Sequence, residues 1–166
     1  MKKFLTLILF LAAASQNLCA HELNSKLKFS NKASMTWFGL PIYEAKLFTK
    51  KNFSFDEEFI LELKYDTGFE GGSIAKRCMK EINNVAKPSA KQQEEWLAKM
   101  MKIFPDVKKG DVIAGVYSPK GVAKFYYNKI FLGEVSDKEF AKAFFSIWFD
   151  EKTSEPEVRK QLLAGL

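Results

Sequence analysis

The sequence predicts an α+β fold in which helices cover one face of an antiparallel sheet. Segments with the two-residue alternation of strands come first, two segments with the spacing of amphipathic helices follow, and the same order then repeats. Strands grouped in this way are typical of antiparallel sheets packed on one side. No linker rich in Pro, Gly or Ser and no internal repeat divides residues 21–166, which we interpret as one domain.

The first strands are expected before residue 66. Residues 26–33 alternate, with Leu27 and Phe29 on one face, and residues 34–49 are rich in aromatic and β-branched side chains around a break at Gly39–Pro41. These segments predict two or three strands. A further strand is indicated by the apolar residues of 59–65.

Two helices are expected next. From Gly71, apolar residues recur at helical spacing until Pro88, and we interpret Gly71-Gly72 as a helix-entry turn and not as a phosphate loop. Ser89 with Gln92 has the form of a capping box, which begins a second helix that Pro105 ends. The apolar stripes are Ile74, Cys78, Ile82 and Val85 in the first helix and Trp96, Leu97, Met100, Met101 and Phe104 in the second.

Strands then resume as a meander over residues 111–117, 122–128 and 129–134. Two further capping-box patterns predict the last two helices. Ser136 with Glu139 begins one that includes Phe140, Ala143, Phe144, Ile147 and Trp148, and Ser154 with Glu157 begins another that ends near Gly165. Trp148 lies in an apolar run too aromatic for an exposed helix face, so we expect it in the core.

The composition argues against several classes of function. The 166 residues include one His and two Cys, too few for a His/Cys zinc site or a disulfide framework, and His21 lies too near the start to suggest a Ser-His-Asp triad. No metal and no cofactor are expected. Only Arg77 and Arg159 are arginines among 26 basic residues, which argues against nucleic acid as a partner because Arg supplies most bidentate readout.

Residues 1–20 have the layout of a signal peptide. Lys2 and Lys3 precede an apolar run that is too short to span a bilayer, and we expect cleavage after Ala20, with a cut after Ala14 or Ser15 as the alternative. The mature protein is then periplasmic or secreted. Cys78 is its only cysteine, and we interpret that residue as a small buried hydrophobe and not as a reactive thiol.

Three segments resemble a known family. They are residues 36–48 (Thr-Trp-Phe-Gly-Leu-Pro-Ile-Tyr-Glu-Ala-Lys-Leu-Phe), residues 104–128 with Gly-Asp-Val-Ile-Ala-Gly-Val-Tyr, and residues 140–156 with Phe-Phe-Ser-Ile-Trp-Phe. Together they resemble the exported bacterial proteins of the chalcone isomerase-like family. The resemblance covers about residues 34–164, and it implies that family's open-faced β-sandwich.

The resemblance to the plant chalcone isomerases is faint at their catalytic positions. Those enzymes use an Arg for the oxyanion, a Thr and a Tyr to polarise the ketone, and an Asn and a second Thr to hold a ring hydroxyl. Thr36 matches the first Thr because it precedes Gly39 of the shared Thr-x-x-Gly segment, which makes it a weak catalytic candidate. The other positions read Asn24, Lys26 or Lys28 for the Arg, Ile74 for the Tyr, Glu81 for the Asn, and Leu132-Gly133 near the second Thr. A shared fold supports architecture more strongly than activity.

Arg77 and Glu81 form the most informative polar pair. They are one helical turn apart, and Glu81 falls within the apolar stripe of its helix, where a carboxylate needs a cation. Arg77 either neutralises Glu81 or binds the carboxylate or enolate of a ligand. The candidate ligand contacts are therefore Thr36, Arg77, Glu81, Tyr117 and Tyr126, with Tyr43 and Tyr127 as further hydroxyls.

Three classes of function stay open, in this order. The first is a non-catalytic protein that binds a small apolar ligand such as a fatty acid, as the Phe and Met content and the fatty-acid-binding relatives of the wider superfamily imply. The second is an isomerase or intramolecular lyase that acts on a chalcone-like or other enolisable substrate. The third is a periplasmic protein-interaction module with an aromatic surface.

Overall fold

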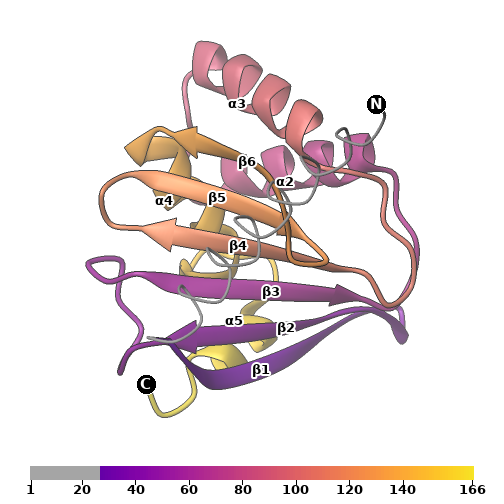
Figure 1. Cartoon of the computed structure of the whole chain (residues 1–166), viewed down its shortest axis with the longest axis vertical. Coiled ribbons are helices and arrows are strands. Elements are labelled where there is room, and N and C mark those ends of the chain that lie inside the picture. Colours follow the sequence, from indigo (N-terminus) through magenta and orange to yellow (C-terminus); the bar gives the residue numbers. More distant parts are fainter. Residues whose placement is uncertain (1–26) are drawn as a thin grey trace, which may run out of the picture.

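The computed structural model describes residues 27–166, so the predicted signal peptide and His21 lie outside the described residues. Six antiparallel strands form one sheet in the order β1 to β6, and the helices lie on one side of it (Figure 1). The strands are β1 (Lys28–Trp37), β2 (Leu40–Thr49), β3 (Phe59–Tyr65), β4 (Val112–Ser118), β5 (Val122–Tyr127) and β6 (Ile130–Ser136). The helices are α2 (Gly71–Val85), α3 (Ala90–Ile103), α4 (Lys138–Phe149) and α5 (Pro156–Leu162). The predicted α+β fold is confirmed.

Alternation along the strands places one set of side chains under the helices. In β3, Phe59, Leu61 and Leu63 belong to the main core, whereas Ile60 faces the other side of the sheet, where it joins a small cluster with Leu27 and Val116. Helix α4 packs on β4 to β6 and helix α5 packs on β1, while α2 packs on α3 and α4. The sheet is therefore covered on one face by a layer of helices, and α2 forms part of the outer side of that layer.

The core between sheet and helices is filled mainly by aromatic rings. Phe59 stacks on Tyr117 with ring centroids 4.8 Å apart, and Phe145 meets both rings edge to face. Trp148 is only 5% exposed, which confirms the prediction that it is a core residue. No helix among residues 27–166 is long and apolar enough to cross a membrane.

Two strand pairs are closed by two-residue turns at the same end of the sheet. Phe38 and Gly39 have φ values of +48° and +78° in the β1–β2 turn, and Asn128 and Lys129 have values of +48° and +73° in the β5–β6 turn. Positive φ at both central residues is the geometry of type I′ turns, whose twist matches that of the flanking strands. The break predicted at Gly39–Pro41 is a tight hairpin turn at Phe38 and Gly39, and Leu40 and Pro41 already belong to β2.

One of the three predicted capping boxes is present, and two are wrong. Ser89 accepts from the backbone N–H of Gln92 and the Gln92 side chain accepts from the backbone N–H of Ser89, as expected. Helix α4 is instead capped by Asp137, which accepts from two backbone N–H groups, because Ser136 is still part of β6. Helix α5 begins after Glu155, because the hydroxyl of Ser154 is engaged elsewhere.

The start of α2 lies against the end of α3, which explains the glycine at its first position. A Cβ atom on Gly71 would lie 2.1 Å from the carbonyl oxygen of Phe104, closer than any side chain allows. The N–H of Gly71 donates to Oδ1 of Asp106 at 2.8 Å. The helix-entry interpretation of this glycine pair is confirmed, and its physical reason is a close backbone approach.

Candidate functional site

Helix α2 carries an ion pair on the side that faces the loop between α4 and α5. The Nε atom of Arg77 lies 2.8 Å from Oε1 of Glu81, one helical turn further along. The side chain of Glu81 is 8% exposed and that of Arg77 is 54% exposed. The predicted pairing is present, with the carboxylate inside and the guanidinium at the surface.

Glu81 is well supplied with hydrogen bonds. Its Oε2 atom accepts from the hydroxyl of Ser154 at 2.7 Å and from the side-chain amide of Asn84 at 3.2 Å. A buried carboxylate needs such donors to offset its loss of water. Arg77 is therefore one of three groups that hold Glu81, and Glu81 does not depend on it alone.

Arg77 keeps binding capacity of its own. Its Nη2 atom lies 3.8 Å from Oε1 of Glu155, which is too long for a hydrogen bond. Neither terminal nitrogen of its guanidinium donates a hydrogen bond to any residue that the structure describes. A guanidinium offers five N–H donors in a planar fork that suits a carboxylate. Arg77 is thus placed to neutralise Glu81 and to receive a further anion.

Glu155 faces this ion pair from the start of α5. Burial raises the pKa of its carboxyl, Arg77 lowers it, and Glu81 raises it again. One guanidinium therefore stands between two carboxylates when both are ionised. Protonation of Glu155 would leave Arg77 facing Glu81 alone.

Beneath α2, a tyrosine and a tryptophan form a second polar contact. The indole Nε1–H of Trp148 donates to the hydroxyl oxygen of Tyr43 at 3.1 Å. Burial raises the pKa of Tyr43 well above its usual range. Burial also raises the pKa of Cys78, which lies on the same helix as Arg77, to about 12. Both groups are therefore neutral near pH 7, and the interpretation of Cys78 as an unreactive thiol agrees with its environment.

The other predicted ligand contacts lie apart from this pair. Thr36 is exposed on β1, next to the β1–β2 turn. The hydroxyl of Tyr117 lies under the helices and donates to the carbonyl of Phe55 at 3.0 Å, whereas Tyr126 packs with the cluster on the uncovered face of the sheet. The structure brings Arg77 and Glu81 together and does not bring the other three to them.

Sequence reasoning missed the residues that complete the cluster. The sequence predicts a helix cap for Ser154 and no role for Glu155 or Asn84. In the structure Ser154 and Asn84 donate hydrogen bonds to Glu81, and Glu155 lies near Arg77. Asn84 lies three residues from Glu81 on the helix and could have been found from that spacing. Ser154 and Glu155 could not, because they approach from a loop about 70 residues away.

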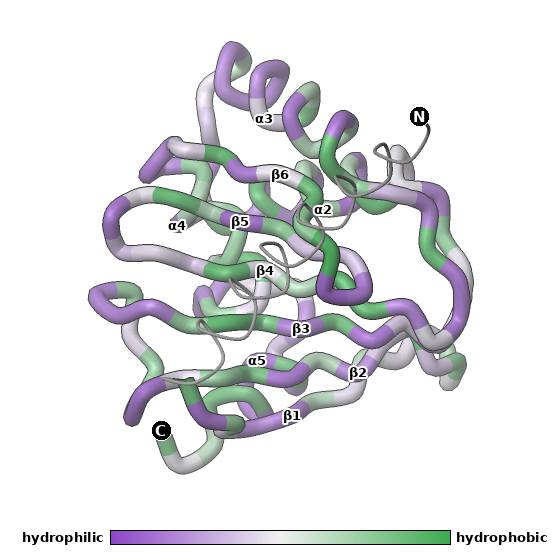
Figure 2. The backbone as a smooth tube through the Cα atoms, viewed as in Figure 1, coloured by the Kyte–Doolittle hydropathy of each residue, from purple (hydrophilic) through white to green (hydrophobic). Residues whose placement is uncertain are grey.

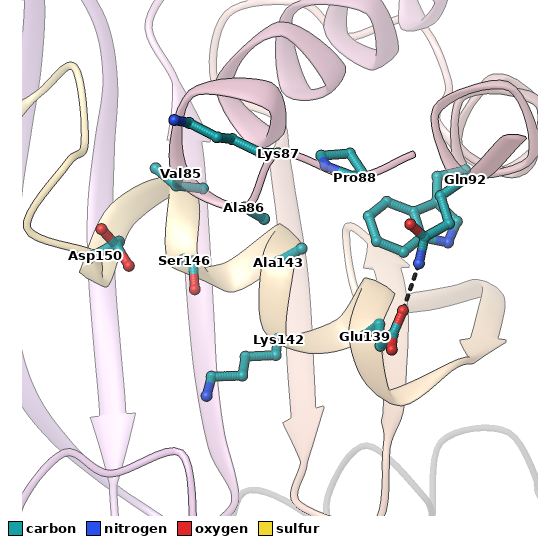
Figure 3. Close-up of a pocket in the computed structure, with 11 residues that line it drawn as sticks. Val85, Ala86, Lys87, Pro88, Gln92, Glu139, Lys142, Ala143, Ser146 and Asp150 are labelled. Atoms are coloured by element: carbon teal, nitrogen blue, oxygen red, sulfur yellow. Dashed lines mark hydrogen bonds between the residues drawn. The ribbon is translucent and has the colours of Figure 1, made fainter. Parts of the chain in front are cut away.

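A cleft of about 420 Å³ opens nearby, between the end of α2, the turn that follows it, α3 and α4 (Figure 3). Gln92 and Glu139 are hydrogen-bonded across one part of it. Lys87 and Lys142 extend to different sides, and the carboxylates of Glu139 and Asp150 share the lining, so the cleft has no single cationic end. Its remaining lining residues are Val85, Ala86, Pro88, Trp96, Ala143 and Ser146.

No group of metal-ligating side chains is present among residues 27–166. The Arg77 cluster, by which we mean Arg77, Glu81, Asn84, Ser154 and Glu155, places an accessible guanidinium beside two carboxylates. The N–H groups of that guanidinium that make no hydrogen bond can bind an anion.

Comparisons with known proteins agree with this architecture. The family described as chalcone isomerase-like matches residues 24–164. The crystal structure of a fatty-acid binding protein from Arabidopsis thaliana is similar, with a TM-score of 0.67 and 11% sequence identity over 83% of this chain and 87% of that one. A search of curated proteins finds no match. Since the family match spans most of the sequence, the chain belongs to the chalcone isomerase-like family.

Proposed function

We propose that this chain is an exported, non-catalytic protein that binds an elongated apolar molecule with a carboxylate end, of the fatty-acid class. The observation that carries the proposal is Arg77, whose terminal nitrogens donate no hydrogen bond to described residues and meet only Glu155, at 3.8 Å, while Glu81 holds the guanidinium in place. A cation fixed at a surface is preorganised for a carboxylate.

The surroundings of Arg77 suit the rest of such a ligand. Ile74 and Cys78 on α2 and Tyr43 on β2 are partly buried and pack against the main core. Arg77 precedes Cys78 on α2, and its positive charge lowers the pKa of both Cys78 and Tyr43 against the larger effect of burial. A cation beside partly buried apolar side chains matches a molecule with one charged end.

The comparisons support binding more than catalysis. The Arabidopsis protein of similar fold is a fatty-acid binding protein, and the resemblance to plant isomerases leaves most of their catalytic positions unmatched. In the fold, Glu81 at the position of the family's Asn is committed to Ser154 and Asn84, and Thr36 stands exposed on β1. Binding without catalysis therefore agrees best with the residues present.

The test is a calorimetric titration of the delipidated chain with dodecanoic acid. Arg77→Met should weaken binding about tenfold or more, because a charge-assisted hydrogen bond contributes roughly 1.5–3 kcal/mol. Binding of the methyl ester should be weaker and indifferent to Arg77. Lys142→Met is the matched control, since it removes one cation from the neighbouring cleft. Loss of affinity in Lys142→Met but not in Arg77→Met would place the ligand in the cleft and overturn the role of Arg77.

Two further measurements address export and catalysis. N-terminal sequencing of periplasmic material should read His21-Glu22-Leu23, and an intact Met1 there would contradict cleavage. The purified chain should not cyclise chalcones faster than solvent does. Stereoselective flavanone formation that Thr36→Ala abolishes would show an isomerase and contradict the non-catalytic proposal.

A further inference from the structure

Large apolar side chains are exposed at one end of the sheet. Because the strands alternate in direction, the β1–β2 and β5–β6 turns lie at the same end, on the right in Figure 1. Figure 2 shows hydrophobic residues in the first turn and beside the second, whose own two residues are hydrophilic. The exposed fractions are 60% for Trp37, 88% for Phe38, 64% for Leu40, 63% for Ile130 and 52% for Phe131. The two turns lie at opposite edges of the six-stranded sheet, so they form two separate exposed apolar groups, each of which indicates contact with something outside the fold.

Phe38 holds its position against local preference. It has a φ of +48° at the first central residue of a type I′ turn, where Asn, Asp and Gly are favoured and a bulky side chain is disfavoured. Its described ring contact is with Trp37, which is itself exposed, at 5.0 Å between centroids. The phenyl ring of Phe38 therefore adds little to the stability of the fold, and we interpret it as a contact for a partner.

The charge pattern favours a lipid surface as that partner. Residues 33–43, which form the end of β1, the turn and the start of β2, contain no charged side chain. Exposed Lys129 stands in the second turn, and Lys64, Lys108 and Lys109 are exposed on neighbouring strands and loops, where they form no ion pair with described residues. Asp66 and Glu70 lie at the same end, so its net charge is small. An uncharged turn flanked by lysines suits an apolar layer beneath phosphate groups.

We propose that the β1–β2 turn inserts into the apolar layer of a phospholipid membrane, with the β5–β6 turn at its surface. Phe38 supplies an apolar ring to the lipid layer, and Trp37 supplies an amphipathic ring of the kind that is enriched at membrane interfaces. Leu40 and Tyr43 lie on the same strand, about 10 Å apart, so docking brings the surroundings of Arg77 close to the lipid. The inference goes beyond ligand binding and does not require it.

Intrinsic fluorescence offers a direct test. Of the three tryptophans, Trp37 is 60% exposed, whereas Trp96 is 2% and Trp148 is 5% exposed. Vesicles of phosphatidylcholine with a third of phosphatidylglycerol, free of fatty acid, should shift the emission of the chain from His21 to shorter wavelength. Brominated lipids should quench the emission of Trp37, since the other two tryptophans are already enclosed by protein.

Two variants separate docking from folding. Phe38→Asn removes the ring and creates the Asn-Gly pair that type I′ turns prefer, so it should fold at least as well as the parent while its partition into vesicles falls about tenfold or more. Phe29→Thr is the control, because Phe29 is 55% exposed at the opposite end of β1, roughly 25 Å from the turn. Its partition should stay within about twofold of the parent.

Three outcomes would overturn the proposal. They are absence of vesicle binding, equal binding by Phe38→Asn and the parent, and a concentration-dependent dimer that Phe38→Asn abolishes, which would make the turn an interface between copies of this chain. Ligand binding is measured separately with soluble dodecanoic acid and no vesicles. Failure of docking is therefore distinguishable from failure of the proposed function.

Discussion

The hydroxyl of Ser154 donates a 2.7 Å hydrogen bond to the buried carboxylate of Glu81 and so ties the loop before α5 to helix α2. Asn84 binds the same oxygen, and Arg77 approaches the other one from the solvent side. The buried part of this cluster is thus held mainly by neutral donors. The guanidinium of Arg77 stays at the surface, where it is available to a ligand.

The first prediction concerns how stability is divided within this cluster. Ser154→Ala should lower the free energy of unfolding by about 1–2 kcal/mol, because it leaves a buried carboxylate oxygen with one donor fewer. Arg77→Met should cost less, about 1 kcal/mol or below, because the guanidinium is half exposed. Urea denaturation of both variants, and of Arg77→Met combined with Glu81→Gln, measures the difference. A larger loss in Arg77→Met than in Ser154→Ala would show that the ion pair dominates.

The second prediction concerns Trp148. Trp148→Ala should lower the free energy of unfolding by about 3–5 kcal/mol, since it removes a buried indole and leaves a cavity. Tyr43→Phe is the companion variant, because it removes only the acceptor of the indole N–H, and it should cost about 1–3 kcal/mol. Denaturation midpoints report both. An unchanged midpoint in Trp148→Ala would mean that the side chain does not pack in the core.

The third prediction contrasts two adjacent glycines. Gly71→Ala should destabilise the protein by more than about 3 kcal/mol, or prevent folding, because its Cβ would meet backbone atoms of Phe104. At Gly72 a Cβ would meet only the flexible end of Met101, at 3.3 Å. Gly72→Ala should therefore be neutral, or stabilise the helix by up to about 1 kcal/mol. Thermal melts that rank the two variants in the opposite order would contradict the close approach.

The fourth prediction concerns pH and Glu155. Burial raises the pKa of Glu155, so the fold disfavours its ionised form, and stability from this group is gained as the pH falls through that pKa. Affinity for dodecanoate should rise in the same range, because Arg77 loses a competing carboxylate. Glu155→Gln should raise affinity near pH 7 by up to about fivefold, in keeping with a partly exposed pair, and remove this pH dependence. Calorimetry of the parent and of Glu155→Gln between pH 5 and 8 measures both effects. If the variant has the same affinity as the parent at every pH, Glu155 does not compete with the ligand.

The fifth prediction concerns Cys78. Burial, reinforced by Glu81, raises the pKa of its thiol to about 12, so the thiolate is scarce near pH 8. Alkylation of the folded mature chain should be about a thousandfold slower than that of the same chain unfolded in urea, because the thiolate is the reactive form. Comparable rates in the two states would show an accessible, reactive thiol.

Much of the fold follows from local patterns in the sequence. The apolar residues of 59–65 identified β3, and the helical spacing after Gly71 placed Arg77 and Glu81 one turn apart on the same helix. The capping box at Ser89 also follows from the local sequence, because Gln92 lies three residues further on. These features depend on residues within about four positions of one another, and the periods of helix and strand fix such geometry.

Other features were decided only by tertiary structure. Ser136 and Ser154 have the same capping pattern as Ser89, yet β6 extends through the first and Glu81 binds the second, because hydrogen-bonding groups go to the partner that the packed chain offers. The sequence gives Tyr117 and Tyr126 the same prediction, a hydroxyl on a strand that contacts the ligand. In the structure the two side chains lie on opposite faces of the sheet.

The sequence by itself determined the order of the elements and the Arg77–Glu81 pair. Tertiary structure alone decided that Ser154 and Glu155 complete that pair and that the apolar side chains at Phe38 and Ile130 share one end of the sheet. The physical reason is the distance along the chain. Contacts between residues about 70 to 90 positions apart depend on how strands and helices stack, and no local period of the sequence encodes that stacking.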